Sequence, residues 1–216
     1  PPSYPVFNED GSYANTYPGT NVNPLRDMRT DYNRVRMTRI FGTAHGAVEI
    51  IKGLKLKEVL SYDYSIQKDA RYFNALSGAG PKSGSDAQSS KGFIEYGKLI
   101  SSTSLNYVRT FANKHHLDVL AAYEAESFQT DKAAGEKSKM PSDQLFEPDN
   151  AAVINSFVSS TQDYRLLSYL TRLNYDYDNR YYIAGSFRRD GSSRLAPEHR
   201  WGNFLSLIHI SEPTRP

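Results

Sequence analysis

The alternation of apolar and polar side chains over residues 167–177 limits the possible fold more than any other feature of this chain. One side of this stretch carries Leu167, Tyr169, Thr171, Leu173, Tyr175 and Tyr177. The other side carries Ser168, Arg172, Asn174 and Asp176, with Leu170 as the exception. A period of two predicts a β-strand with one apolar and one polar face. Asp178-Asn179 predicts a tight hairpin turn, because both residue types tolerate left-handed backbone. The return strand is expected from Arg180.

Further strands are predicted along the chain, and the lengths of their connections alternate. The expected strands cover residues 32–51, 54–66 (extending as far as Phe73), 91–110, 117–128 and the start of one more at 201–204. Short connections are expected at 52–53, 111–115 and 178–179, long loops at 74–90 and 130–163, and a medium loop at 190–199. A helical turn is expected at 151–158. Outer-membrane barrels have short turns at one rim and long loops at the other, so the chain is predicted to be all-β, with antiparallel up-and-down strands.

Composition removes several classes of function. The chain has 216 residues, no cysteine, 16 tyrosines and a formal net charge of +2, which favours neither nucleic acid nor an acidic substrate. Mean hydropathy is low, at -0.62. No stretch approaches the roughly 18 apolar residues of a transmembrane helix, so a membrane protein of this sequence would have to be a barrel.

The tyrosines of the predicted strands have two possible roles. They are Tyr62, Tyr64, Tyr107, Tyr123, Tyr169, Tyr175, Tyr177 and Tyr181. Amphipathic rings suit the boundary between membrane and water, which favours aromatic girdles. The alternative is ordinary cross-strand packing in a soluble sheet. The alternating connections favour the girdles.

Three polar motifs could suggest metal binding or catalysis, but each has a simpler structural interpretation. His115 and His116 are neighbours on a predicted strand and point to opposite faces, so we expect no metal site and no cofactor. The carboxylates of Asp63, Asp118, Glu124 and Glu126 have no spacing that predicts a catalytic pair and are expected to face a wet lumen. The run from Arg188 to Arg194 contains a glycine turn and hydroxyls, and we interpret it as a structural turn. We therefore expect no catalytic residue and no enzyme.

One long segment resembles a known family. Residues 168–204 are similar to a segment of the SusC/RagA family of TonB-dependent outer-membrane transporters. The matching residues are Ser168-Tyr169-Leu170, Arg172, Asn174-Tyr175, Tyr177-Asp178, Arg180-Tyr181, Arg188-Arg189-Asp190-Gly191-Ser192-Ser193-Arg194 and Arg200-Trp201-Gly202. A second match, at 49–64, reads EIIKGLKLKEVLSYDY, close to a family run EILKGLKFKTSFGADY. The match departs at Leu195, where the family has an aromatic residue, and ends after Phe204.

The resemblance implies a fold, a function and partners. It implies that residues 32–204 form part of a large transmembrane barrel, of about 22 strands in the complete protein and unclosed here. Such transporters import oligosaccharides or peptides across the bacterial outer membrane, with a SusD-like surface lipoprotein and with energy from the TonB complex acting on a plug. Substrate contacts stay unknown. The alternative from the residues alone is a soluble or surface-anchored β-sandwich that binds glycans; a β-rich hydrolase is disfavoured.

The two ends of the sequence carry expectations of their own. Residues 1–31 are rich in Pro, Asn and Gly and are expected to form a loop leading into the barrel. The chain opens without Met or a signal peptide, and we interpret it as a fragment whose plug lies elsewhere. Residues 205–215 read LSLIHISEPTR, which resembles a translated transposase-type sequencing adapter. We therefore expect 205–216 to be a non-native tail; the alternative is a genuine divergent end.

Overall fold

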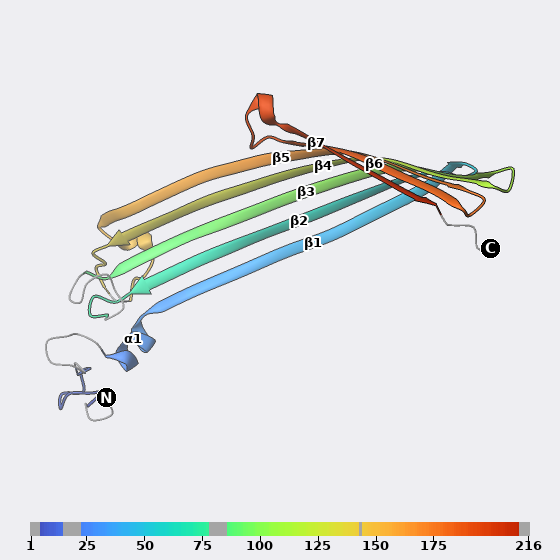
Figure 1. Ribbon diagram of the computed structural model, residues 1–216. Helices are drawn as coiled ribbons and strands as arrows, with labels where there is room; N and C mark the ends of the chain where they lie inside the picture. Colours follow the sequence, from blue (N-terminus) through green and yellow to red (C-terminus); the bar gives the residue numbers. More distant parts are fainter. Residues whose placement is uncertain (1–4, 15–22, 78–85, 143, 212–216) are drawn as a thin grey trace. The chain divides into compact units, whose positions relative to one another are not determined.

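Seven β-strands dominate the computed structural model, which describes residues 5–14, 23–77, 86–142 and 144–211. They are β1 (Tyr32–Ile51), β2 (Leu54–Phe73), β3 (Gln88–Phe111), β4 (His115–Ser138), β5 (Val153–Tyr177), β6 (Tyr181–Ser192) and β7 (Trp201–Ser211). They pair in chain order in one up-and-down sheet (Figure 1). The predicted fold class is confirmed, and the described residues form one sheet rather than the two facing sheets of a sandwich.

The hairpin of β5 and β6 forms as its sequence predicts. Its antiparallel register ends at Tyr177 opposite Tyr181. Asp178 and Asn179 adopt left-handed backbone, with φ of 55° and 54°. The Asn179 N–H donates to the Asp176 carboxylate at 3.1 Å, which closes the turn.

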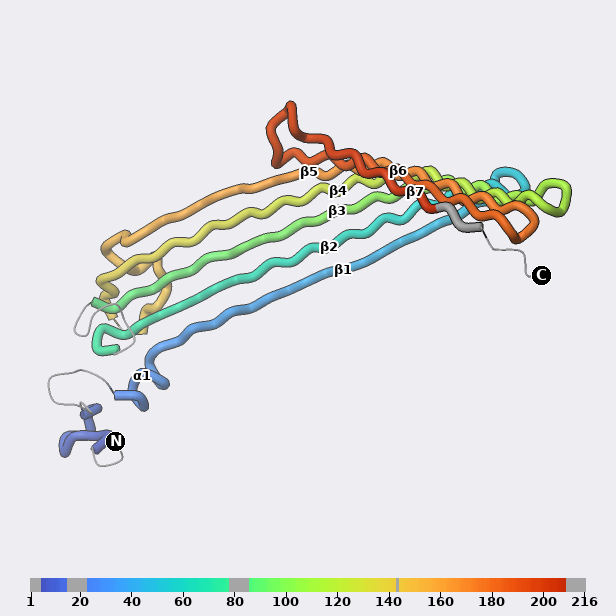
Figure 2. The backbone as a smooth tube through the Cα atoms, viewed as in Figure 1, coloured from blue at the N-terminus to red at the C-terminus, as the bar shows by residue number. Residues whose placement is uncertain are grey.

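Two compact units divide the chain, and we describe each by itself. The first comprises Pro1–Arg39, Ser65–Glu95 and Thr130–Thr161, and the second Ile40–Tyr64, Tyr96–Gln129 and Gln162–Pro216. The long connections, after β2 and after β4, fall in the first unit. The short turns, after β1, β3 and β5, fall in the second (Figure 2).

The predicted loop at 130–163 is too long. Strand β4 continues to Ser138 and β5 begins at Val153, so only residues 139–152 connect them. In the extra length of β5 the apolar residues Val153, Ile154, Phe157 and Val158 fall on both faces, so no apolar side alternates with a polar one. Side-chain bonds support the pairing there, from Thr161 to Asp131 at 2.6 Å and from Ser138 to Asn155 at 2.8 Å. The helical turn expected at 151–158 is also wrong, because a 3-10 turn lies at Pro148–Asn150 instead.

The other two expected loops are shorter as well. Strand β3 already begins at Gln88, and part of the loop expected at 74–90, residues 78–85, lies outside the described residues. Strand β6 extends to Ser192, and a second 3-10 turn, η2 (Pro197–His199), occupies the connection expected at 190–199.

A short helix, α1 (Pro24–Thr30), lies inside the segment predicted to be a loop. Asn23 caps it, with its side-chain oxygen accepting from the N–H groups of Leu25 and Arg26 at 3.1 Å each. The buried Asn23 amide also donates to the Val6 and Ala14 carbonyls, at 2.9 and 2.6 Å. The sequence contains this Asn-Pro start signal, but seven residues are too few to show a helical period. No helix among the described residues is long and apolar enough to cross a membrane.

Strand β7 extends beyond the expected end at Phe204. It pairs with β6 from Gly191 opposite Trp201 to Tyr181 opposite Ser211. The backbone of 205–211 thus continues the ladder. Whether these residues are native stays a prediction, and residues 212–216 lie outside the described part of the chain.

Candidate functional site

One face of the second unit carries bonded polar side chains, and we call it the polar face. The Glu126 carboxylate of β4 is its first centre. Lys98 of β3 reaches it at 2.8 Å, and the Tyr164 hydroxyl of β5 donates to it at 3.0 Å. The Arg194 guanidinium lies over the Tyr164 ring, 3.9 Å from its centroid. Side chains of β3 and β5 thus meet one carboxylate of β4, and a loop arginine covers the tyrosine of that cluster.

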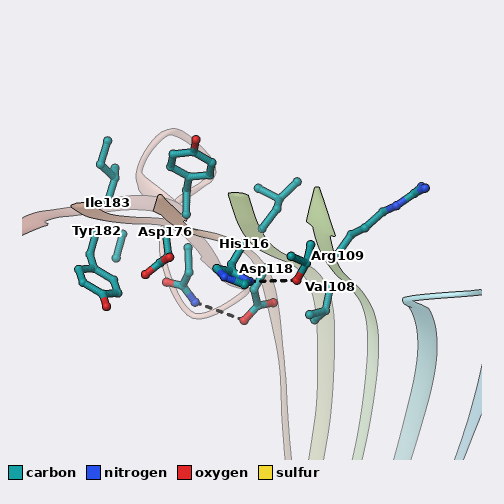
Figure 3. Close-up of a pocket in the computed structure, with 12 residues that line it drawn as sticks. Val108, Arg109, His116, Asp118, Asp176, Tyr182 and Ile183 are labelled. Carbon is teal, nitrogen blue, oxygen red and sulfur yellow. Dashed lines mark hydrogen bonds between the residues drawn. The ribbon is translucent and has the colours of Figure 1, made fainter. Parts of the chain in front are cut away.

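Asp118 of β4 is the second centre of the polar face. The Asn174 amide donates to its Oδ2 at 3.3 Å, and Arg172 approaches the same oxygen at 3.5 Å. The other oxygen, Oδ1, is buried and has no hydrogen-bond partner in the described part of the chain. Asp118 and Asn174 line a hollow of about 330 Å³ with His116, Asp176 and Tyr182 (Figure 3).

The arginine run on β6 has the structural role expected of it. Arg188 pairs with Asp190 two residues on, at 2.7 Å, and also reaches Ser168 at 3.4 Å. The Ser193 hydroxyl accepts from the Arg165 N–H at 2.8 Å, and the Ser193 N–H donates to the Arg165 carbonyl at 3.0 Å. The run therefore ties the β6–β7 connection to β5.

The carboxylates suggested by the sequence occupy separate places. Glu126 and Asp118 each have their own cation, on different partner strands. Such ion pairs neutralise and position a carboxylate, which is what the wall of a polar lumen requires. The structure does not bring Glu126 and Asp118 together around a shared partner.

The two histidines have different partners. The His115 ring meets the Tyr175 hydroxyl at 2.6 Å. The His116 ring, labelled in Figure 3, meets the Thr110 hydroxyl at 2.9 Å. Consecutive strand residues point to opposite faces, so the two rings do not converge. The described residues contain no cluster of three side chains able to hold a metal ion.

Aromatic side chains occupy the opposite face of the second unit, which we call the aromatic face. The Tyr169 ring lies 5.4 Å from that of Tyr123 and 6.1 Å from that of Trp201. Arg189 lies over the Trp201 ring at 4.8 Å. Tyr175 and Tyr177 meet the His115 ring on this same side of the sheet. The sequence analysis did not assign Trp201 and Arg189 to this face. Arg189 stands two residues from Phe187 on β6, and this spacing would have placed both side chains on one side of the strand.

Large apolar side chains on the aromatic face are open to solvent. Leu173 is 43% exposed, Tyr169 44% and Leu205 83%. Phe187 of β6 lies opposite Leu205 of β7 and is also exposed. A contiguous apolar surface of this kind is typical of a site that contacts protein, ligand or lipid.

In the first unit, the connection 139–152 is anchored to the strand ends. The Phe146 ring meets Tyr32 of β1 and Tyr72 of β2, with centroids 5.8 and 5.9 Å apart. The Ser89 hydroxyl of β3 donates to the Phe146 carbonyl at 2.5 Å, and Lys91 pairs with Glu147. Tyr72 is almost fully buried, with 1% of its surface exposed. Sequence reasoning missed this aromatic cluster, because its members lie far apart in the chain.

Comparisons with curated proteins find TonB-dependent receptors. The chain is 27% identical over 212 residues to TonB-dependent receptor P39 of Formosa agariphila, covering 95% of this chain and 20% of that protein. It is 43% identical over 61 residues to TonB-dependent receptor SusC of Bacteroides thetaiotaomicron, which covers 28% of this chain and 6% of SusC. No family model matches the chain.

Solved structures share the fold. The RagAB peptide transporter superimposes with a TM-score of 0.80 at 18% identity, covering 94% of this chain and 23% of that one. The RagAB peptide importer in its closed-closed state also gives 0.80, at 19% identity over the same shares. The chain spans about a fifth of the length of the curated relatives that it matches over most of its own length. These relatives are receptors and transporters rather than enzymes.

Proposed function

We propose that this chain, a SusC/RagA-like segment, forms part of the membrane-spanning wall of a TonB-dependent outer-membrane transporter. The observation that carries the proposal is the contrast between the two faces of the second unit. One face pairs its charges, as at Lys98 and Glu126. The other leaves Leu173 and Tyr169 exposed. A barrel wall needs this contrast, because one face meets lipid and the other meets a polar lumen.

The two kinds of connection give the wall a direction. Short turns are periplasmic and long loops extracellular in barrels of this class. On that rule the turns after β1, β3 and β5 are assigned to the periplasmic rim, and the connections after β2, β4 and β6 are assigned to the extracellular rim.

The named relatives support a cargo and partners for the proposed transporter by analogy. We infer import of an oligosaccharide, as the SusC resemblance implies, or of a peptide, by analogy with the RagAB peptide transporter. A SusD-like surface lipoprotein would pair with the complete transporter, and the TonB complex would act through a plug. The chain itself supplies wall and loops and has no catalytic role in this proposal.

The test uses the full-length protein that contains this chain, expressed in a bacterium with an outer membrane. We expect it to fractionate with that membrane and to migrate faster on gels without heating than after boiling, as folded barrels do. Deletion of its gene should abolish growth on one class of polymer, either glycan or peptide, and reintroduction should restore it. A protein found in the soluble fraction would contradict the proposal. Growth on each polymer class separates the two cargoes.

A further inference from the structure

A second hollow, in the first unit, is lined by cations and aromatic rings. Its volume is about 540 Å³. Arg34 and Arg36 of β1, Lys68 of β2 and Lys91 of β3 contribute the charge. Phe93 and Phe157 contribute apolar surface. We call it the cationic hollow.

Small residues create the depth of the cationic hollow. Ala133 and Gly135 of β4 form its floor, between the larger side chains of β3 and β5. The Phe157 ring lies over Gly135, 3.6 Å from where a Cβ would stand. A larger residue at 133 or 135 would occupy the space between the cations and this ring.

The charge of the cationic hollow is not neutralised within the described residues. Asp69 is its one acidic lining residue, against four cations. Both Asp69 oxygens already accept from the Gln67 amide, at 3.1 and 3.2 Å. Lys91 is paired with Glu147. Arg36 and Lys68 are exposed and have no carboxylate partner in the described part of the chain.

Strand alternation relates the cationic hollow to the aromatic face. Steps of two along β5 lead from Tyr169 to Phe157, and along β4 from Tyr123 to Gly135. On β2, Tyr62 and Lys68 are also separated by an even number of positions and share one side of that strand. Phe157 and Gly135 thus stand on the side of their own strands that carries Tyr169 and Tyr123, which is the strand side that the proposed function assigns to lipid.

We propose that the cationic hollow binds the phosphate of a phosphorylated glycolipid headgroup in the outer leaflet. Guanidinium and ammonium groups recognise phosphate through charge-assisted hydrogen bonds. Phe93 and Phe157 would contact the apolar and sugar portions of the same lipid. The proposal rests on the proposed function, since only a membrane protein meets such a lipid. An acidic cargo would instead need cations on the lumen side.

The test compares two variants of the full-length protein that each lose two positive charges. Arg36→Gln with Lys68→Gln removes two of the three cations of the hollow that have no carboxylate partner among the described residues. Lys55→Gln with Lys57→Gln is the matched control, because both lysines are exposed and lie on the opposite side of β2 from Lys68. Each protein is purified in detergent and checked for a heat-modifiable barrel. Native mass spectrometry then measures binding of three probes: phosphorylated lipid A, dephosphorylated lipid A and inorganic phosphate.

We expect the unmodified protein and the control to bind phosphorylated lipid A, and the hollow variant to bind it at least about tenfold more weakly, since each lost charge-assisted bond accounts for about one decade. Dephosphorylated lipid A should bind weakly to all three. Equal binding of both lipids, or equal loss in both variants, would overturn the proposal. Inorganic phosphate that displaces the lipid and binds alone just as tightly would also overturn it, in favour of a free anion.

Failure of the proposed function gives a different result. In that case the unmodified protein shows no heat-modifiable barrel, and the lipid proposal falls with it. A folded barrel in the membrane that ignores the lipid phosphate contradicts the lipid proposal alone. Loss of import of an acidic cargo in the hollow variant, with lipid binding unchanged, would assign the hollow to the cargo instead.

Discussion

Gly53 occupies a position that only glycine fits without strain. Its φ of +87° belongs to the left-handed region, and an added Cβ would collide with the Val108 carbonyl oxygen. The Gly53 N–H donates to the Glu49 carboxylate at 2.8 Å, and its carbonyl accepts from the Val108 N–H at 2.8 Å. The turn between β1 and β2 is therefore attached to β3 through this residue.

Gly53→Ala should lower the free energy of unfolding of the full-length barrel by about 2 kcal/mol, since it combines left-handed strain with a backbone clash. Gly46→Ala is the control, because nothing lies within 4 Å of a Cβ there. Urea titration, read by the folded fraction on unheated gels, gives both values. A Gly53 variant as stable as the Gly46 variant would contradict this account of the turn.

Local sequence chemistry predicts such turns well and their surroundings poorly. Lys52-Gly53 and Asp178-Asn179 are turn signals that the structure confirms. The contact between Gly53 and Val108 could not be predicted, because it joins strands whose relative register no local pattern fixes. The same holds for Glu126 with Lys98 and Tyr164: each residue type is visible in the sequence, but the convergence is tertiary.

At the scale of the elements, the sequence predicts those parts of the strands in which apolar side chains occupy one face. The bounds of β1 match the prediction because the Lys52-Gly53 turn marks its end. The outer parts of β4 and β5 were missed, since hydrogen bonds such as that from Thr161 to Asp131 stabilise them without an apolar stripe. Helix α1 was missed because its cap, rather than a period, defines it.

The Phe146 ring is one of the contacts that anchor the connection 139–152. Phe146→Ala removes the contacts with Tyr32 and Tyr72, each an aromatic pair of about 1 kcal/mol. We expect amide hydrogen exchange in 144–150 to become about tenfold faster, while the strands keep their protection. Leu145→Ala is the control, because that neighbouring side chain is about as exposed (48% against 44% for Phe146) but has no ring to pair with the tyrosines. Equal exchange in the two variants would show that other contacts anchor the connection.

The sheet leaves many large apolar side chains exposed. Its two edge strands, β1 and β7, each pair with one neighbour and have no partner on their outer edge among the described residues. Unpaired edges and apolar patches promote aggregation in water. We therefore expect the isolated chain of 216 residues to be insoluble without detergent. Sedimentation of the chain with and without a mild detergent measures this. A stable, soluble monomer would count against the barrel-wall assignment and favour a soluble β-domain.

The assignment of the two faces is open to a direct comparison in the full-length protein. Leu173 is exposed on the aromatic face, and Leu170 lies on the polar face of the same strand, near Arg172. An arginine on the lipid face of a barrel costs about 2–4 kcal/mol near the bilayer midplane, whereas a lumen position tolerates charge. Leu173→Arg should thus reduce the amount of folded protein in the outer membrane several-fold, and Leu170→Arg should leave that amount nearly unchanged.

Quantitative blotting of outer-membrane fractions measures the difference between the two variants. A soluble sheet that is open to water on both faces would accept either arginine. If Leu170→Arg were the damaging substitution, the lumen and lipid faces would have to be exchanged, and the cationic hollow would then face the cargo path.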